Sequence, residues 1–434
     1  MSFESLGLAP ALLRALSENN YTTPTPIQAE AIPLALAGRD VLGGAQTGTG
    51  KTAAFGLPVL NRLAKATPPS GPRKPRALIL TPTRELALQV SDSLRGYAKH
   101  LRLNISAIYG GAGMQPQVDN LRRGVDVLVA CPGRLIDHLE RGTARLDNIE
   151  VLVLDEADRM LDMGFLPAIK RILGKLPAQR QTLLFSATFE ARIKALALEF
   201  MRDPRQVQIA AQNTIAETIA HRAHPVDASR KRDLLVDILA KRHTEQVMVF
   251  GKTKHGCNRL AEQLETAGLS AAAIHGNKSQ AQRQKALAQF KAGKVRVLVA
   301  TDVAARGLDI ANLPLVINYD LPMVAEDYVH RIGRTGRNGA SGEALSLVAP
   351  EEGGLLRQVQ NMLKAPVELV TVEGFEPSRP IQMNAPLPKH GNQRPARGHR
   401  PHGKPAQRHA HAGGPKRNGN SSGRAAAPRR DSRG

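Results

Sequence analysis

The chain is predicted to be an α/β protein built on parallel sheets, and three features of the sequence support this fold class. Short apolar runs without polar alternation recur along the chain, and helix-prone segments rich in Ala, Leu, Lys and Glu separate them. Polar residues and glycines follow directly after many of the runs. Continuous apolar runs are typical of parallel strands buried on both faces. Strand and helix in alternation favour right-handed βαβ units in an open sheet.

The apolar runs form two groups, which predicts two such domains. Strands are expected at residues 41–42, 77–80, 105–109, 126–129, 151–154 and 182–185, and then at 246–250, 271–274, 296–299, 315–318 and 344–348. Helices are expected between them, for example at 85–100 and 254–267. A polar stretch without strong periodicity separates the groups. We therefore expect a first domain at 1–206, a linker at 207–217 and a second domain at 218–375.

The last part of the chain has a different composition. Residues 376–434 contain 13 Lys/Arg against 2 Asp/Glu, which is half of the total net charge of +22, and no Phe, Tyr or Trp. Such a segment cannot bury enough apolar surface to offset its chain entropy, so we expect a disordered basic tail. Its expected partner is a polyanion, with nucleic acid first. Five irregularly spaced histidines in this tail are expected to be solvated.

Composition excludes several other classes of protein. At 434 residues the chain is long enough for two or three domains, and no apolar run approaches the 18 residues needed to span a bilayer. The first ten residues lack the basic and apolar regions of a signal peptide. Two cysteines, Cys131 and Cys257, make neither a disulfide framework nor a zinc site built from thiolates alone. We expect a cytoplasmic protein that is not inserted in a membrane.

A glycine-rich segment after the first strand is typical of a phosphate-binding loop. It comprises Ala45, Gln46, Thr47, Gly48, Thr49, Gly50, Lys51 and Thr52. Its glycines let backbone N–H groups surround a polyphosphate, Lys51 reaches the outer phosphates and the Thr52 hydroxyl can bind Mg²⁺. The strict pattern has glycine where this chain has Ala45. The competing interpretation, a glycine-rich helix start, explains fewer of these residues.

An acidic motif, Asp155-Glu156-Ala157-Asp158, follows the predicted strand at 151–154. One carboxylate can bind the metal and another can orient or deprotonate an attacking water. An acidic, solvated helix start is the alternative explanation. Because polar segments gather after the carboxyl ends of strands, where open α/β sheets bind ligands, the two motifs together predict hydrolysis of a nucleoside triphosphate.

Three further segments complete a family pattern. Tyr21 and the segment 24–28 (PTPIQ) lie near the start, with Phe3 as an upstream aromatic, and 301–309 (TDVAARGLD) and 330–337 (HRIGRTGR) lie in the second half. With the motifs above, these resemble the DEAD-box RNA helicases over about 370 residues. The resemblance implies two tandem RecA-like domains, ATP as substrate, Mg²⁺ as cofactor and RNA as partner. An aromatic such as Tyr21 can stack on adenine while the Gln28 amide bonds its edge.

The resemblance also implies roles for individual residues. The catalytic residues would be Lys51, Asp155, Glu156, Arg334 and Arg337, the last two acting as arginine fingers. ATP would be bound by Tyr21, Gln28, residues 45–52, Gly307 and Asp309, and Mg²⁺ by Thr52 and Asp155. Hydrolysis would be coupled to strand separation through Asp158, Ser186, Thr188 and His330. His330 taken alone is equally explained as a core histidine.

RNA would contact both domains through phosphate and sugar rather than through bases. The matching positions are Pro82, Thr83, Arg84, Gly110, Gly111, Gly133, Arg134, Thr253, Gln280, Arg283, Thr301 and Arg306. Aromatic residues are only 3% of the chain and tryptophan is absent, which disfavours a base-stacking platform. Such contacts position a strand without reading its sequence. Cys131 stands where the family usually has threonine, which removes one hydroxyl contact to phosphate.

The segments 1–8 (MSFESLGL) and 164–173 (GFLPAIKRIL), with the basic tail, resemble the bacterial RhlE subgroup. We expect a monomer that separates short RNA duplexes locally, or remodels RNA–protein complexes, in ribosome assembly or RNA degradation. Two alternatives remain open. One is an ATP-gated RNA clamp or annealing scaffold that uses the basic tail, and the other is a DNA helicase.

Overall fold

The computed structural model describes residues 2–45, 48–66, 73–189, 191–209, 219–243, 245–305, 308, 310, 312–336 and 341–387. Six residues with predicted roles, Gln46, Thr47, Arg306, Gly307, Asp309 and Arg337, lie outside the described residues, as do most of the expected linker and residues 388–434. The described part forms two α/β lobes, which we call lobe 1 (residues 2–209) and lobe 2 (residues 219–387). No helix within the described ranges is both long and apolar enough to cross a membrane.

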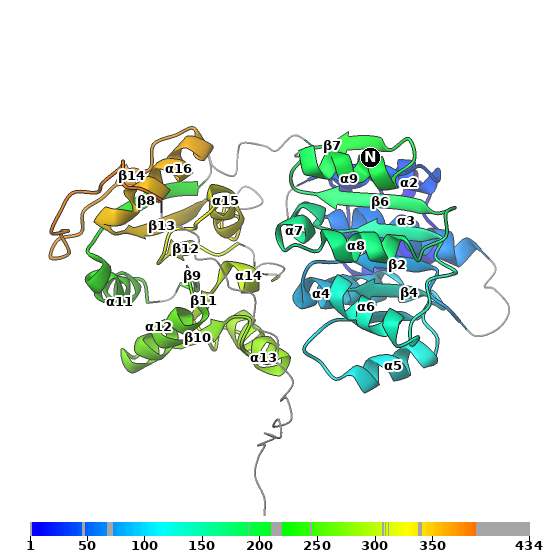
Figure 1. Ribbon diagram of the computed structural model, residues 1–434, viewed down its shortest axis with the longest axis horizontal. Coiled ribbons are helices and arrows are strands. Elements are labelled where there is room, and N and C mark those ends of the chain that lie inside the picture. The colour runs from blue at the N-terminus through cyan, green and yellow to red at the C-terminus, as the bar shows by residue number, and fades with distance from the viewer. Residues whose placement is uncertain are drawn as a thin grey trace, which may run out of the picture. The chain divides into compact units, whose positions relative to one another are not determined.

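Lobe 1 alternates strands and helices, as the apolar runs predicted (Figure 1). Its strands are β1 (Val41–Gly44), β2 (Ala77–Leu80), β3 (Ile105–Ile108), β4 (Val127–Ala130), β5 (Val151–Leu154), β6 (Gln181–Ser186) and β7 (Arg205–Gln208). Its helices are η1 (Glu4–Leu6), α1 (Pro10–Glu18), α2 (Pro26–Leu36), α3 (Lys51–Lys65), α4 (Arg84–Tyr97), α5 (Met114–Arg122), α6 (Pro132–Glu140), α7 (Ala157–Asp162), α8 (Leu166–Leu173) and α9 (Ala191–Phe200). The sheet order is β3-β4-β2-β5-β6-β1-β7, and the strands pair in parallel.

Lobe 2 repeats this architecture. Its strands are β8 (Ile219–Pro225), β9 (Val247–Phe250), β10 (Ala271–Ile274), β11 (Val297–Ala300), β12 (Leu315–Asn318), β13 (Gly342–Val348) and β14 (Glu368–Leu369). Its helices are η2 (Ala228–Arg230), α11 (Lys231–Lys241), α12 (Lys254–Thr266), α13 (Gln280–Lys291), α14 (Asp302–Ala305), α15 (Ala325–Ile332), η3 (Pro350–Glu352) and α16 (Gly353–Leu363). The sheet order is β10-β11-β9-β12-β13-β8-β14, and the strands again pair in parallel. The loops that follow these strands therefore lie together at the carboxyl ends of the strands.

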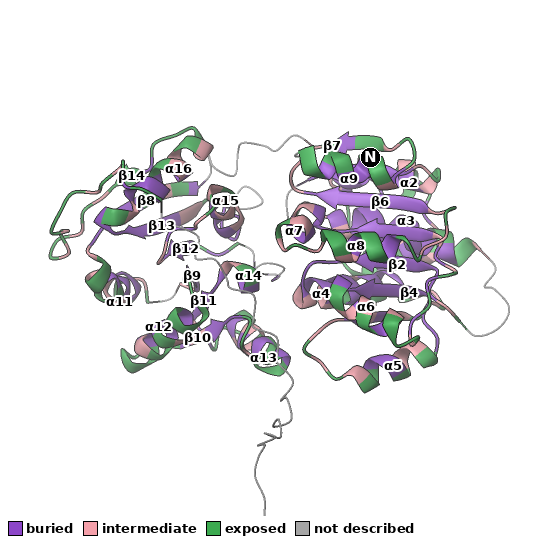
Figure 2. Ribbon diagram, viewed as in Figure 1, coloured by how far each residue is buried: buried purple, intermediate pink, exposed green. Residues whose placement is uncertain are grey.

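Both faces of each sheet are covered, which explains why the central strands read as uninterrupted apolar runs. In lobe 1, one face packs against α1 to α4 and the other against α6, α8 and α9. In lobe 2, α11 and α12 cover one face, and α13 with α15 and α16 covers the other. Figure 2 shows the resulting pattern of buried strands beneath helices with exposed outer faces. Burial on both faces is the expected state of strands joined by helical crossovers.

Three strands were not predicted, and all lie at or next to sheet edges. β7 has the exposure pattern exposed, exposed, buried, exposed, and its sequence RQVQ carries little apolar signal. It pairs with β1, so lobe 1 continues through residues that the sequence analysis placed in the linker. β8 (IAHRAHP) and the two-residue β14 are similarly polar. Edge strands are half exposed, so the apolar periodicity that identifies central strands is weak there.

The boundary of the tail also differs from the expectation. Residues 376–387, which the composition assigned to the tail, pack on lobe 2 as an extended segment that we call the strap. The Ser378 backbone N–H and hydroxyl both donate to the Asp227 carboxylate, and the Gln382 N–H donates to the Pro350 carbonyl at 2.8 Å. A Cβ atom on Gly353 would lie 2.3 Å from the Gln382 carbonyl oxygen, so the strap requires glycine there. Lobe 2 as the structure describes it therefore includes the strap and extends to Leu387.

A fully buried histidine, His138, lies on α6 of lobe 1. The Thr143 hydroxyl donates its proton to the His138 carbonyl, so His138 Nδ1 must carry the proton in its 2.8 Å bond to Thr143 Oγ1. Nε2 has no partner among the described residues. Burial, reinforced by the nearby Arg134, lowers the pKa of His138 below its usual 6.5. The ring is therefore neutral near pH 7.

Candidate active site

The glycine-rich segment connects β1 to α3, as the sequence predicted. Gly48 and Gly50 have φ of 88° and 89°, a left-handed conformation that glycine adopts without steric cost. Gly50 is the N-cap of α3, so the helix begins at Lys51 and its first N–H groups face the loop. The buried Lys51 ammonium donates to the Ala45 carbonyl at 2.8 Å. A turn of this form, with a lysine folded back across it, is suited to a polyphosphate.

Helix α2 supports this loop directly. The Gln28 amide accepts from the Thr25 N–H at 3.0 Å and donates to the Gly50 carbonyl at 3.0 Å, while the Thr25 hydroxyl donates to the Thr49 carbonyl at 2.8 Å. A Cβ on Gly50 would lie 2.3 Å from Gln28 Nε2 and would displace this amide, and the Gly50 φ of 89° favours glycine as well. The Gln28 amide thus holds the phosphate loop in this structure, and its contact with adenine stays a prediction.

Tyr21 lies at the end of a small aromatic cluster. Its ring stands edge-on to Phe3 and Tyr97 at centroid distances of 6.2 and 5.8 Å, and its hydroxyl is 3.0 Å from that of Tyr97. The Tyr21 side chain is 37% exposed, whereas Phe3 is buried. Tyr21 therefore has a solvent-accessible face near the start of α2, and Phe3 serves as its support.

Two adjacent carboxylates follow β5 and have different environments. Asp155 is buried, and its Oδ1 has no hydrogen-bond partner among the described residues. Burial raises the pKa of Asp155 to about 7, against the attraction of Lys51 and with a further contribution from the Glu156 charge. Burial acts on Glu156 in the same direction, but the Arg159 and Lys51 cations outweigh it, so the pKa of Glu156 is lowered. Such divergence between neighbouring carboxylates is typical of catalytic sites.

Glu156 is held in a specific conformation. It has φ 53° and ψ 54°, a left-handed conformation that is unusual for a residue other than glycine. Its Oε2 accepts from Arg159 Nη1 at 2.7 Å, and both side chains are more than 90% buried. Arg159 was not among the predicted site residues. Its position three residues after Glu156, one helical turn away, was the available signal.

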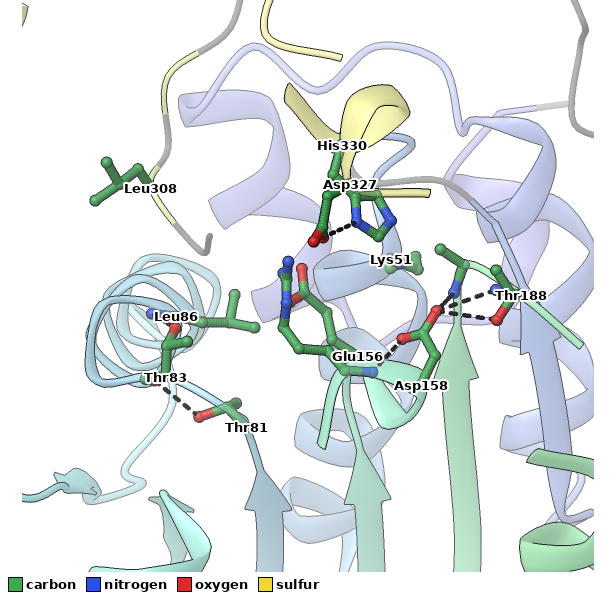
Figure 3. A network of polar contacts seen from close by, with 12 residues as sticks. Lys51, Thr81, Thr83, Leu86, Glu156, Asp158, Thr188, Leu308, Asp327 and His330 are labelled. Carbon is green, nitrogen blue, oxygen red and sulfur yellow. Dashed lines mark hydrogen bonds and ion pairs between the residues drawn. The ribbon is translucent and has the colours of Figure 1, made fainter. Parts of the chain in front are cut away.

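Asp158 joins the acidic motif to the segment after β6 (Figure 3). Its Oδ2 accepts the backbone N–H groups of Ala187 and Thr188 at 2.9 and 3.1 Å, and the Thr188 hydroxyl lies at 3.5 Å. Burial raises the pKa of Asp158, but Lys51 and the N–H donors reverse this, and the net direction is downward. Ser186 completes the turn by donating to the Thr188 carbonyl at 2.7 Å. Asp158, Ser186 and Thr188 thus form one bonded unit.

The predicted RNA-binding residues of lobe 1 gather at the carboxyl ends of the strands of its sheet. Thr83 is the N-cap of α4, and its hydroxyl accepts from the Leu86 N–H at 3.3 Å. The guanidinium of Arg84 lies over Gly111, where a Cβ would be 2.0 Å from Nη1, and the Gly111 φ of 76° favours glycine there. Arg134 donates to the Ala112 carbonyl at 3.1 Å. Two arginines and a glycine pair thus form a surface with donors suited to a phosphate backbone.

Cys131 precedes this surface as the N-cap of α6. Its side chain makes no capping hydrogen bond, in contrast to Thr83. Burial raises the pKa of the Cys131 thiol to about 12. The thiol is therefore protonated at neutral pH.

In lobe 2, the predicted RNA-binding residues begin helices or follow strands. Thr253 is the N-cap of α12, and its hydroxyl accepts from the Gly256 N–H at 2.9 Å. Gln280 is the first residue of α13, and neither atom of its amide has a partner among the described residues. Thr301 follows β11, and its carbonyl accepts from Ala304 and Ala305. An amide left without partners in this way is available to a ligand.

The arginines of the segment 330–337 have different environments. Arg334 is buried, and its Nη1 donates to the carbonyls of Leu308 and Ile310 at 2.5 and 3.4 Å. Arg331, to which the sequence analysis gave no role, binds both oxygens of Asp302. His330 lies 3.9 Å from Asp327, a weak contact on the same helix. The roles of Arg334 and His330 stay predictions.

The acidic motif has the chemistry expected of a magnesium ligand bound together with phosphates. Mg²⁺ in such sites takes one or two carboxylates and keeps substrate or water oxygens as its other ligands. Within the described ranges no group of three His, Cys, Asp or Glu residues could hold a metal by itself. The buried, unpartnered Oδ1 of Asp155 is the oxygen that fits such an ion.

Comparisons with known proteins bear on the family of this chain. The DEAD/DEAH box helicase family model matches residues 25–196, and that of the helicase conserved C-terminal domain matches residues 230–339. The chain is 44% identical over 367 residues to the DEAD-box ATP-dependent RNA helicase CshA of Geobacillus kaustophilus, covering 85% of this chain and 78% of that protein. It is 44% identical over 382 residues to the ATP-dependent RNA helicase DeaD of Mycobacterium tuberculosis, covering 87% and 67%.

Among solved structures, S. cerevisiae Dbp5 bound to RNA and ADP BeF3 matches with a TM-score of 0.75 and 32% identity, covering 86% of this chain and 95% of that one. A DEAD box protein from Methanococcus jannaschii matches with a TM-score of 0.50 and 38% identity, covering 85% and 99%. The prediction of two tandem RecA-like domains with parallel sheets is confirmed.

Proposed function

Because this chain belongs to the DEAD-box family of ATP-dependent RNA helicases, we propose that RNA stimulates its ATP hydrolysis and that the cycle separates short duplexes locally. The observation that carries this proposal is a bonded path in lobe 1: Arg159 donates to both Glu156 and Asp158, and Asp158 accepts from the turn that contains Ser186 and Thr188. The last step of this path is made by the Asp158 carboxylate, which accepts two backbone N–H groups of the turn.

In the proposed ATP site, the phosphate loop and Lys51 hold the phosphates, and Tyr21 and Gln28 contact the adenine. Asp155 and Thr52 would hold Mg²⁺, which neutralises phosphate charge when bound. Glu156, kept ionised by Arg159, orients and deprotonates the attacking water. Lobe 2 would supply Arg334 and Arg337 to the γ-phosphate and Asp309 to the ribose. Arg334 would first exchange its bonds to the Leu308 and Ile310 carbonyls for phosphate oxygens.

RNA is proposed to bind along Thr83, Arg84 and Arg134 in lobe 1 and Thr253, Gln280 and Thr301 in lobe 2. Phosphate and sugar contacts of this kind are independent of sequence. Binding of ATP and RNA would each favour the same closed arrangement, which is positive coupling between the two ligands. The basic tail would add affinity through phosphate neutralisation.

Glu156→Gln tests the proposal. We expect loss of RNA-stimulated ATP turnover with retained binding of ATP and RNA, because the amide keeps the shape but cannot take a proton. Glu140→Gln is the matched control, since that side chain is half exposed and pairs with Arg171 on the surface. RNA-stimulated turnover in Glu156→Gln at the level of Glu140→Gln would remove the assigned role.

The second candidate function is an ATP-gated RNA clamp or annealing scaffold, which the charge of the tail favours. Unwinding and annealing of one labelled duplex, measured with and without ATP and with and without residues 389–434, separates the two activities. ATPase stimulation by RNA against DNA of the same sequence tests the preference for RNA.

The finer assignments are proposals as well. We propose an RhlE-like, cytoplasmic, monomeric enzyme that acts in ribosome assembly or RNA degradation. The opening segment and the basic tail support the subgroup, and a map of RNA crosslinked to the protein in cells would identify the process.

A further inference from the structure

A five-residue loop, residues 275–279, connects β10 to α13 in lobe 2 and leads directly into Gln280. The loop ends in a capping box, in which Ser279 accepts from the Gln282 N–H and its own N–H donates to the Gln282 side chain at 2.9 Å. The position of the loop therefore sets the position of the first turn of α13, which carries Gln280 and Arg283.

His275, the first residue of this loop, is 2% exposed and uses both ring nitrogens. Nδ1 lies 3.3 Å from the Asn277 backbone nitrogen, and Nε2 lies 2.8 Å from Asn258 Oδ1 on α12. A backbone N–H can only donate, so Nδ1 is the acceptor and the proton of the neutral ring is on Nε2. One ring thus links the loop to the neighbouring helix.

A second contact ties the same loop to α12. The Lys254 ammonium donates to Asn277 Oδ1 at 3.1 Å, and Lys254 lies one helical turn before Asn258. Because α12 starts at the N-cap Thr253, these contacts connect one predicted RNA-binding residue with the helix that carries two others.

The electrostatic surroundings favour the neutral ring. Burial lowers the pKa of His275, and the nearby cations Lys278, Lys254 and Arg283 lower it further. The ring therefore keeps its Nδ1 acceptor near pH 7, where the loop N–H requires one.

We propose that His275 is a positioning residue for RNA: its Nδ1 fixes the 275–279 loop at Asn277, which Lys254 ties to α12, so that Gln280 and Arg283 are set for the RNA backbone. The inference rests on the proposed RNA-binding function. It assigns to His275 no contact with RNA. The alternative is a buried histidine that contributes only to the stability of lobe 2.

Three substitutions separate these roles by geometry. His275→Asn keeps an acceptor near the place of Nδ1, and Lys254 still ties Asn277 to α12. His275→Gln keeps a donor near the place of Nε2 but removes the acceptor for the Asn277 N–H. His275→Ala removes both. We expect His275→Ala and His275→Gln to raise the RNA concentration that gives half-maximal ATPase stimulation about fivefold. This factor corresponds to about 1 kcal/mol for one net hydrogen bond.

His275→Asn is expected to stay within twofold of the wild type, and the KM for ATP and the kcat at saturating RNA are expected to be unchanged in all three variants. His224→Ala is the matched control. His224 is also buried in lobe 2 and bonds the Val370 carbonyl at 2.7 Å, but it lies on β8, toward the opposite edge of the sheet from β10. It is expected to leave RNA stimulation unchanged.

Gln280→Ala tests the site on which the inference rests. If it weakens RNA stimulation while His275→Ala and His275→Gln do not, the positioning role is wrong and the RNA site stands. The positioning role is also wrong if His275→Asn needs as much RNA for half-maximal stimulation as His275→Ala. If Gln280→Ala has no effect, the proposed RNA site is itself wrong, and the inference falls with it. Should His275→Ala fail to fold, hydrogen exchange of residues 275–283 is compared in the other two variants. These residues are expected to exchange faster in His275→Gln than in the wild type, and at the wild-type rate in His275→Asn.

Discussion

Arg331 makes four side-chain hydrogen bonds within lobe 2, and its removal should destabilise that lobe specifically. Its side chain is 2% exposed. Nε and Nη2 donate to the two oxygens of Asp302 at 2.6 and 2.8 Å, and Nη1 donates to Asn318 Oδ1 at 3.0 Å and to the Asp320 carbonyl at 2.6 Å. The guanidinium also lies 5.0 Å from the centroid of the Phe250 ring.

Arg331→Met removes these four bonds and the charge while keeping much of the side-chain volume. Asn318 is fully buried, so its Oδ1 loses a partner that water cannot replace, which costs about 1–3 kcal/mol. The Asp302 side chain is 25% exposed and recovers part of its hydration. We therefore expect a loss of about 3 kcal/mol, the lower end of the range for breaking a buried ion pair. Arg331→Lys keeps the charge but not the two-pronged contact, and about 1–2 kcal/mol is expected for one or two lost bonds.

Hydrogen exchange of the intact protein measures this loss locally. A loss of about 3 kcal/mol corresponds to about 100-fold faster exchange in β12 and α15, with β5 of lobe 1 as an internal reference. Arg222→Met is the matched control, because Arg222 pairs with Glu343 and Glu368 but is 45% exposed. An exposed pair of this kind contributes at most about 1 kcal/mol. Exchange in Arg331→Met within threefold of the wild type, or equal to that in Arg222→Met, would refute the reasoning.

Three further predictions concern stability. Cys131→Thr supplies the missing side-chain cap of α6 and should raise the free energy of unfolding, measured in urea, by about 0.5–1 kcal/mol. Cys131→Val should not raise it. Equal free energies of unfolding in the two variants would show that the cap is not formed. Because the pKa of His138 is lowered in the folded protein, the unfolded chain binds more protons as the pH falls below 6.5, so stability is present above that pH and lost below it. Between pH 7.5 and 5.5 the wild type should lose at most about 1.4 kcal/mol more than His138→Gln, and parallel pH profiles would contradict this. A chain ending at Pro388 should melt like the full chain, whereas one ending at Phe375 lacks the strap and should melt about 4–8 °C lower for a loss of about 2 kcal/mol; identical melting would mean that the strap adds no stability.

The sequence by itself determined the fold class and the residues that lie next to one another along the chain. The eleven apolar runs predicted as strands all correspond to strands of the two sheets. The phosphate loop, the acidic motif at Asp155 and the tripeptide at Ser186 were identified because each is contiguous and follows a strand whose burial leaves a clear apolar signal.

Only the tertiary structure decided which of these segments bind one another. The bond from Gln28 to the Gly50 carbonyl, that from Asp158 to the Thr188 N–H and the two-pronged contact of Arg331 with Asp302 join residues that are 22 to 30 positions apart. Their partners depend on the order of strands in the sheet, which apolar periodicity does not report. The edge strands and the strap escaped prediction for a related reason: half-exposed residues carry little apolar pattern, and their position is set by hydrogen bonds to a surface that exists only once the lobe has folded.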